Sequence, residues 1–576
     1  MAERRLAIAI TGGVSLGAYE AGVIAETLFL LDYNNQNNTS VKWYVDALAG
    51  ASAGGMTSAV LAMMLLNGSL TGAAPDDDKN LLKKVWVKTI SLDVLDPANK
   101  VGLSDNFMFA SGAIDKIASD NIKFPSTVAP HRALRDARGA NGAHIALALT
   151  HSRLGQGLQA VPTFTGTEFF FNEHAALSRF DIRIKPNAAG ILAAAFTGNG
   201  VSALSQPANG TALDSGGAFA GMISCAIACG AFPFAFAPRA LALMDDQNNW
   251  SLDYFTDGGL YDNDPVGQAI NLAHEIDWGP DADDFSDTER RYLTIEPEPG
   301  QDPDNWPPAP QLLSGTNMLN VDPLTMVGRI LGGALQELQQ SGVRGIPEVN
   351  RRVKIRQDLI AQLEYYIHVA SGDLTLPSWL PDMVNHIGKS RGLSTEQMNY
   401  FRAHFIPDLE VEAPVAYGGA RSLPSERQQL FAEFGLLIDL AMDVTDKVAF
   451  EPILVNPKAE LAGDPLYAFK GFFDVRIRQH DFAQGIADAL EVWQGVQKKE
   501  GSQILKLPNQ AVAVPAAPDI GDADLDRVKA RLETIINSAI GGLPDLEKLY
   551  VKAALQWQIN LFLGSFLKSL DSPQDQ

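Results

Sequence analysis

The beginning of the chain repeats one pattern, in which a short apolar run is followed by a glycine-rich turn and then by a helix-like segment. Residues 6–10 and 45–49 have the length and composition of buried strands, and residues 18–31 and 56–66 are expected to be helices. Strands that alternate with helices in this way are typical of a parallel sheet covered by helices. The pattern therefore predicts an α/β fold for the N-terminal part of the chain.

The chain of 576 residues is too long for a single hydrophobic core. Further strands are expected at residues 144–149, 161–171, 180–184 and 292–295, whereas the alanine- and glycine-rich residues 186–217 are expected to hold a helix between loops. Six prolines between residues 297 and 310 predict a domain boundary near residue 300. We expect a sheet domain at residues 1–300, with an insertion at about 67–140.

The remaining residues, 301–576, are expected to form a mainly helical region. Their apolar residues recur with helical spacing in several segments, among them the pair 525–539 and 546–567. No motif in this half carries a recognisable chemistry. Its role is left open between packing, subunit pairing and contact with a membrane surface.

The second glycine-rich turn has the sequence Gly50-Ala51-Ser52-Ala53-Gly54. Such a turn between a strand and a helix exposes its serine, and the glycines on both sides permit a strained backbone and close packing. The pattern is common in a chain with 50 glycines, but its place after a strand and before a helix is the one that the chemistry requires. Ser52 is therefore a candidate nucleophile, with Gly50 and Gly54 as the glycines of the elbow.

The first glycine-rich turn runs from Thr11 to Ala18 and also joins a strand to a helix. Successive backbone amides in such a turn form a concavity that can bind an anion. A nucleotide-binding loop is excluded, because the glycine spacing differs and no lysine follows the last glycine. A tight turn without a ligand stays open as the alternative.

A third motif, Asp257-Gly258-Gly259, places a carboxylate in a turn. Taken alone, this motif is far more often a simple turn than a functional site. A calcium loop is not indicated, because residues 262–264 lack the alternating acids and the distal glutamate of such a loop. We expect no metal and no cofactor.

In this order, the three motifs resemble those of the patatin-like phospholipase family. The resemblance covers about residues 5–270 and implies a three-layer α/β/α sheet domain. It implies that Ser52 and Asp257 are the catalytic residues and that Gly12, Gly13 and Val14 form the oxyanion hole. Residues 226–233 and 262–265 resemble the segments that flank the family's aspartate. The chain departs from the family at Val14 and Leu16, where a third glycine and a basic residue are usual.

A histidine-based triad on an α/β-hydrolase fold is the competing interpretation of the serine turn. That fold needs several strands before the serine and a histidine late in the chain. Only two predicted strands precede Ser52, and none of the late histidines lies in a suggestive turn; they are His368, His386, His404 and His480. The basic partner is therefore expected to be Asp257.

The resemblance implies a lipid acyl hydrolase, of phospholipase A or carboxylesterase type, that works through an acyl-serine intermediate. Two alternatives stay open. An acyltransferase would use the same acyl-enzyme and pass the acyl group to an alcohol. A non-catalytic lipid-binding protein would fit the departures at Val14 and Leu16.

A net charge of −23 argues against nucleic acid as a partner, because the phosphates would be repelled. It also disfavours docking on anionic lipid through bulk charge, although peripheral membrane contact through a local patch stays open. The two cysteines, Cys225 and Cys229, are expected to be core residues. Neither a signal peptide nor a membrane-spanning run is recognised, so we expect a cytoplasmic protein. Non-classical secretion and homo-oligomerisation are left open.

Overall fold

The computed structural model describes most of the chain in two compact units. The first unit comprises Met1–Ser341 and Pro452–Gln576, and the second comprises Gly342–Glu451. The described residues are 2–95, 109–125, 127–136, 142–162, 168–232, 235–245, 248–260, 265–278, 288–299, 341–369, 374–391, 393–412, 420–442, 451–464, 468 and 470–518. The predicted helices at 525–539 and 546–567, and residues 262–264, lie outside this range.

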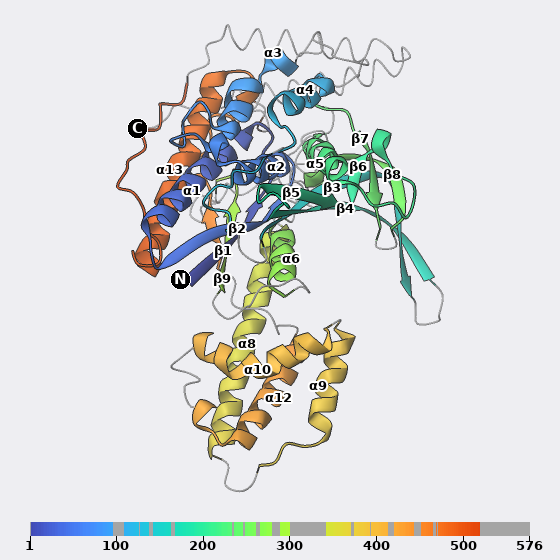
Figure 1. The fold of residues 1–576 in the computed structure, drawn as a ribbon, viewed down its shortest axis with the longest axis vertical. Coiled ribbons are helices and arrows are strands. Elements are labelled where there is room, and N and C mark those ends of the chain that lie inside the picture. The colour runs from blue at the N-terminus through green and yellow to red at the C-terminus, as the bar shows by residue number, and fades with distance from the viewer. Residues whose placement is uncertain are drawn as a thin grey trace, which may run out of the picture. The chain divides into compact units, whose positions relative to one another are not determined.

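A ten-stranded mixed sheet is the centre of the first unit (Figure 1). Along the sheet the order is β10-β9-β1-β2-β3-β8-β7-β6, while β4 pairs with β3 and β5. The strands from β10 to β3 run parallel, and the pairings beyond β3 are antiparallel. The strands are β1 (Ala2–Ile10), β2 (Val41–Gly50), β3 (Ala143–Pro162), β4 (Glu168–Pro186), β5 (Leu192–Gly198), β6 (Gly200–Ser202), β7 (Arg239–Met244), β8 (Trp250–Asp257), β9 (Thr288–Ile295) and β10 (Ile453–Val455).

Helices cover both faces of this sheet, which gives the three-layer α/β/α architecture expected from the sequence. Figure 1 shows α1, α2, α5 and α13 on one side of the sheet and α6 on the other. The helices of the unit include α1 (Gly17–Asn37), α2 (Ala53–Leu66), α4 (Ser111–Asn121), α5 (Ser215–Cys229), α6 (Pro265–Trp278) and α13 (Val475–Glu500). The predicted α/β fold is therefore confirmed.

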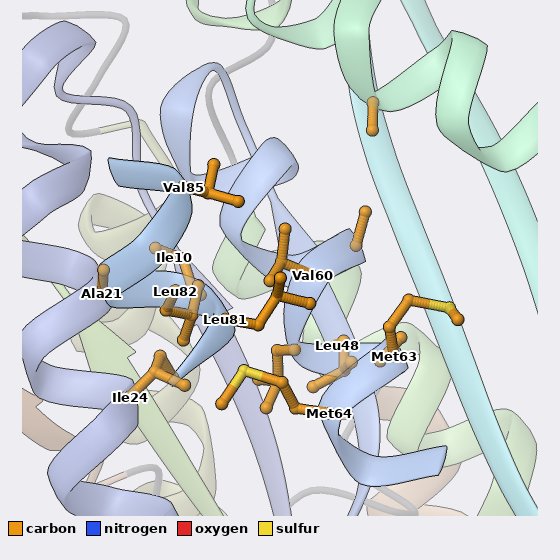
Figure 2. Close-up of a cluster of buried hydrophobic side chains, with 14 of the residues drawn as sticks. Ile10, Ala21, Ile24, Leu48, Val60, Met63, Met64, Leu81, Leu82 and Val85 are labelled. Atoms are coloured by element: carbon orange, nitrogen blue, oxygen red, sulfur yellow. The ribbon is translucent and has the colours of Figure 1, made fainter. Parts of the chain in front are cut away.

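The hydrophobic core between the sheet and its helices includes part of the segment that was expected to be an insertion. Figure 2 shows Ile10 of β1 and Leu48 of β2 beside side chains of α1 and α2, with Leu82 and Val85 in the same cluster. Leu82 is fully buried and Val85 is 5% exposed. Val85 belongs to the π-helical segment η3 (Lys83–Thr89). Leu82 and Val85 are thus part of the central packing of the domain.

Val14–Asn37, which includes α1, is apolar enough and long enough to cross a membrane, the one such stretch among the described helices. However, 89% of its 18-residue apolar window is buried inside the fold. A helix that is enclosed on several sides is apolar all round, because no side of it faces water. Its composition is therefore explained by its central position against the sheet and α13.

The described residues 452–518 pack in the same unit as the sheet. β10 adds to the sheet beside β9, with Val455 opposite Ile295. Helix α13 lies against α1, where a methyl group on Gly22 would come within 2.0 Å of the Phe482 carbonyl oxygen. Such a close approach of two backbones is open only to glycine. The division expected at about residue 300 places these residues with the helical region, whereas here they complete the sheet domain.

The second unit is helical in its described parts. It contains α8 (Ser341–Val369), α9 (Trp379–Ser390), α10 (Thr395–Glu412) and α12 (Ser425–Met442). A buried ion pair joins α8 to α12, since the Arg356 Nε lies 2.9 Å from the Asp439 Oδ1. A mainly helical region in the C-terminal half is thus present, as predicted.

Residues 186–217 differ from the sequence-based expectation of a helix between loops. The described structure has strands β5 and β6 here, and β5 pairs with β4 along its whole length. Alanine at three successive positions of β5 favours a helix by local propensity. Pairing with β4 overrides that propensity, because sheet position depends on the neighbouring strand.

Candidate active site

The serine turn between β2 and α2 has the geometry of a nucleophile elbow. Ser52 has φ 51° and ψ −127°, a conformation that costs about 1–3 kcal/mol for a residue other than glycine. A methyl group on Gly54 would lie 2.2 Å from the Ile10 carbonyl oxygen, and one on Gly50 would lie 2.4 Å from the Gly54 oxygen. Gly54 is therefore required for the turn to pack against the end of β1, and Gly50 is required for the turn to close against the start of α2.

The structure brings Ser52 and Asp257 together although 205 positions separate them in the sequence. The Ser52 hydroxyl donates a hydrogen bond of 2.5 Å to the Asp257 Oδ2. The other carboxylate oxygen accepts a hydrogen bond of 2.8 Å from the Gly259 amide. Ser52 is 6% exposed and Asp257 is 3% exposed. The aspartate is thus oriented by the turn that follows β8, with one oxygen directed at the serine.

Burial raises the pKa of Asp257 to about 6, although hydrogen bonds from Ser52 and from the Gly259 amide lower it. Removing a carboxylate from water disfavours its charged form, and this effect is the larger one here. The carboxylate is consequently a stronger base than an exposed aspartate, yet it is still ionised at neutral pH. A group tuned in this way can accept a proton from the hydroxyl that it contacts.

The first glycine-rich turn passes directly over Ser52. A methyl group on Gly12 would lie 2.6 Å from the Ser52 Cβ and 3.3 Å from its Oγ. Among the described residues, the backbone amides of Gly12, Gly13 and Val14 have no hydrogen-bond partner. Of the three residues expected to form an oxyanion hole, Gly12 thus lies against Ser52 and Val14 lines the same cavity as Ser52.

Val14 has a positive φ of 50° in this loop, immediately before Ser15. This region of backbone conformation is unfavourable for a β-branched residue, which makes Val14 a true outlier. The family's third glycine would adopt it without strain. The loop thus has a backbone conformation that suits glycine, and the Val14 side chain lines the cavity beside Ser52.

An apolar cavity opens at Ser52, and a second cavity adjoins it. The second lies between α2, α4, α5 and η3, and the two share five lining residues: Met56, Trp86, Ile90, Ile114 and Ile227. The only charged side chain that lines either cavity among the described residues is Arg239, which pairs with Asp115. Two adjoining apolar cavities beside a serine hydroxyl suit a hydrocarbon chain.

Several residues of this cavity were not predicted from the sequence. Trp86, Ile90 and Ile114 come from the segment that was expected to be an insertion, and Phe472 comes from the C-terminal half. Their apolar character is ordinary for core residues, so the sequence carries no local sign of their role.

Histidine does not contact the candidate nucleophile in the described part of the chain. The buried His151 pairs with the Ser178 hydroxyl at 2.8 Å, and burial lowers its pKa to about 3, so its ring is neutral. His480 contacts Asp481 instead. The Ser52 hydroxyl is thus left with Asp257 as its partner. Cys225 and Cys229 are both free and buried, as expected for core residues.

Comparison with known protein families agrees with this arrangement. The model of the family described as patatin-like phospholipase matches residues 8–270, a range that contains all three motifs. No curated protein matches the chain significantly. Members of this family act as lipid acyl hydrolases, so lipid esters are the substrates that the match implies. Residues 8–270 of this chain thus match the patatin-like phospholipase family.

Proposed function

We propose that the protein hydrolyses lipid acyl esters, with Ser52 as nucleophile and Asp257 as its general base. The observation that carries the proposal is the 2.5 Å hydrogen bond between the two side chains at the end of an apolar cavity. A buried carboxylate in contact with a serine hydroxyl, without a histidine, suits a dyad rather than a triad.

In the first half of the reaction, the Ser52 oxygen attacks the ester carbonyl carbon and its proton passes to the Asp257 Oδ2. The carbonyl oxygen becomes negatively charged and accepts hydrogen bonds from the amides of Gly12, Gly13 and Val14. When the carbon–oxygen bond of the ester breaks, the proton on Asp257 passes to the leaving alcohol. The acyl group is then bound to Ser52 as an ester.

In the second half, water takes the place of the alcohol. Asp257 accepts a proton from the water as its oxygen attacks the acyl carbon, and the same amides stabilise the second oxyanion. The bond to the Ser52 oxygen breaks, and the serine takes the proton back from Asp257. The products are a free fatty acid and the restored dyad.

The apolar residues that line the cavity favour a substrate whose acyl part is a hydrocarbon chain. Met56 of α2, Ile114 of α4 and Ile227 of α5 line both parts of the cavity, so an acyl chain would be desolvated along its length. Hydrolysis of phospholipids or of simpler carboxylic esters fits this wall equally. The two kinds of substrate differ in the alcohol part of the ester.

The test is release of fatty acid from phospholipid vesicles and of p-nitrophenol from short esters, with Ser52→Ala and Asp257→Asn beside the natural chain. We expect both variants to lose at least a hundredfold in kcat/KM, because each removes one half of the dyad. Ser58→Ala is a matched control, since Ser58 is a buried serine of the helix that follows Ser52 and, among the described residues, hydrogen-bonds to the Ala49 carbonyl.

Full activity in the Ser52→Ala variant would exclude the proposed nucleophile. Added glycerol or lysolipid distinguishes the acyltransferase alternative, because a transferase would produce a new ester in place of free fatty acid. A folded protein that releases neither product from any ester would support lipid binding without catalysis.

A further inference from the structure

A segment outside the family-matched range contacts the candidate oxyanion loop. The Ser15 amide donates a hydrogen bond of 3.0 Å to the Ala468 carbonyl oxygen. The Ser15 hydroxyl also donates to the Ala468 oxygen, and it accepts a hydrogen bond of 3.1 Å from the Gly471 amide. Three hydrogen bonds thus join the residue after Val14 to a segment more than 450 positions away.

The fit between the loop and this segment is close. A methyl group on Gly471 would lie 2.5 Å from the Ser15 Oγ, and one on Gly463 would lie 3.2 Å from a methyl carbon of Leu16. Both Ser15 and Leu16 are 1% exposed. The segment therefore encloses the loop on the side where the family usually carries a basic residue at the position of Leu16.

The beginning of α13 holds the segment in place. The buried Arg478 donates to the carbonyl oxygens of Gly471 at 2.7 Å and Phe472 at 3.3 Å. A third hydrogen bond, 3.0 Å long, runs from its Nε to the Val87 carbonyl of η3. The planar guanidinium group makes them from two nitrogens held in a fixed geometry, whereas all the donors of a lysine lie on one nitrogen.

Asp481 of α13 binds the other end of the segment. Its two carboxylate oxygens accept hydrogen bonds of 2.9 Å from the amides of Ala462 and Gly463. Between these anchors, Phe472 lines the cavity next to Ser52. The described residues 461–464, 468 and 470–474 are therefore tied to the helix α13, to the wall of the cavity and to the loop.

The loop needs such support because of Val14. Its positive φ is disfavoured for valine, and a loop free to relax would rotate the amides at positions 12–14 away from their present directions. Ser15 is the next residue, and its amide and hydroxyl are both held by the segment. The hydrogen bonds of Ser15 thus oppose the relaxation at the point where it would begin.

We propose that the described residues 461–464, 468 and 470–474 are a clamp that positions the oxyanion loop, and that Ser15 is the positioning residue through which it acts. The inference rests on the proposed function, because it concerns the amides that receive the negative charge. It predicts that the acyl hydrolase site is completed by a part of the chain that the family model does not include.

The test compares Ser15→Ala with Ser178→Ala, a matched control. Ser178 is an equally buried serine of the same unit, but it contacts His151 and Cys225. We expect Ser15→Ala to lower kcat for a p-nitrophenyl ester about tenfold to a hundredfold with KM within twofold, since small misplacements of catalytic groups have effects of this size. The control is expected to keep kcat within twofold, at a similar loss of thermal stability.

Two further measurements separate positioning from a general loss of structure. A trifluoromethyl ketone lipid analogue bonds to the Ser52 oxygen and forms an oxyanion, so its affinity should fall in parallel with kcat, whereas the affinity of an unreactive ether analogue should not change. In a Val14→Gly background the loop loses its strain. The logarithm of the fold-change in kcat caused by Ser15→Ala should therefore be at most half of its value in the natural background.

Arg478→Lys is the second variant should Ser15→Ala fail to fold. This variant keeps the positive charge and loses the planar set of guanidinium donors. We again expect a lowered kcat with KM within twofold. The clamp is overturned if a folded Ser15→Ala, or Arg478→Lys in its place, keeps kcat and ketone affinity within twofold, or if the effect is equal in both Val14 backgrounds. An inactive natural chain would instead overturn the proposed function itself.

Discussion

Replacing Gly12 with alanine should inactivate the enzyme by moving two parts of the site apart. The added methyl group would lie 2.6 Å from the Ser52 Cβ, whereas ordinary carbon contacts begin at about 3.4 Å. The loop and the elbow must therefore separate by about 0.8 Å (3.4 − 2.6). Both are backbone turns fixed by their neighbours, so neither can yield by a simple side-chain rotation.

A displacement of this size affects activity more than stability. A misplacement of about 1 Å costs on the order of a hundredfold in rate, and overpacking in a close-packed region costs about 1–3 kcal/mol. We expect Gly12→Ala to lower kcat/KM for a p-nitrophenyl ester about a hundredfold or more. Urea unfolding should show that the free energy of unfolding falls by about 1–3 kcal/mol.

Gly495→Ala is the control, because Gly495 lies in α13 with no atom within 4 Å of the added methyl group. The same chemical change there should stabilise the helix by about 0.5–1 kcal/mol and leave kcat/KM unchanged. A Gly12→Ala variant that keeps more than half of the natural kcat/KM would refute the account of the loop. It would show that the loop does not lie against the nucleophile during catalysis.

Three further predictions follow from the same structure. Because the Asp257 carboxylate must be ionised and its pKa is about 6, kcat/KM should fall below about pH 6 with an acidic limb of slope one; a profile flat down to pH 4.5 would exclude it as the base. Burial raises the pKa of Glu296 from 4.5 to about 8, so its contribution to stability is complete below about pH 4.5 and is lost as the pH rises toward 8. Glu296→Gln should therefore narrow the difference in Tm between pH 5 and pH 8, and an unchanged difference would contradict the shift. Ala118→Phe should fill the second cavity, which lies away from Ser52, and lower turnover of long-chain esters against butyrate; equal effects on both would show that acyl chains do not reach it.

The parts of the site that could be predicted are those encoded by short, contiguous motifs. The elbow at Ser52 requires glycines at fixed positions, and the turn at Asp257 is followed by two glycines, so each leaves a local mark in the sequence. Their order along the chain indicated which family to expect. The α/β layering was equally local, because strand and helix periodicities follow each other within 66 residues.

The parts that could not be predicted depend on contacts between distant segments. Ser15 donates hydrogen bonds to the Ala468 carbonyl oxygen from its amide and its hydroxyl, and a backbone carbonyl carries no side-chain signature. Trp86 and Phe472 are apolar residues of the kind that any core contains, so their place in the cavity follows only from the packing. The prediction of a helix at β5 was wrong because three successive alanines favour a helix locally, whereas the pairing with β4 depends on a different segment.

The most direct test of the account is to trap the acyl-enzyme. The protein is mixed with a p-nitrophenyl ester or a phospholipid, quenched in acid during turnover, digested and examined by mass spectrometry. The account predicts that the acyl mass appears on the peptide that contains Ser52, that it accumulates during the burst of p-nitrophenol, and that Ser52→Ala shows neither. Turnover with an unmodified Ser52 peptide, or an acyl group on a different residue, would contradict it.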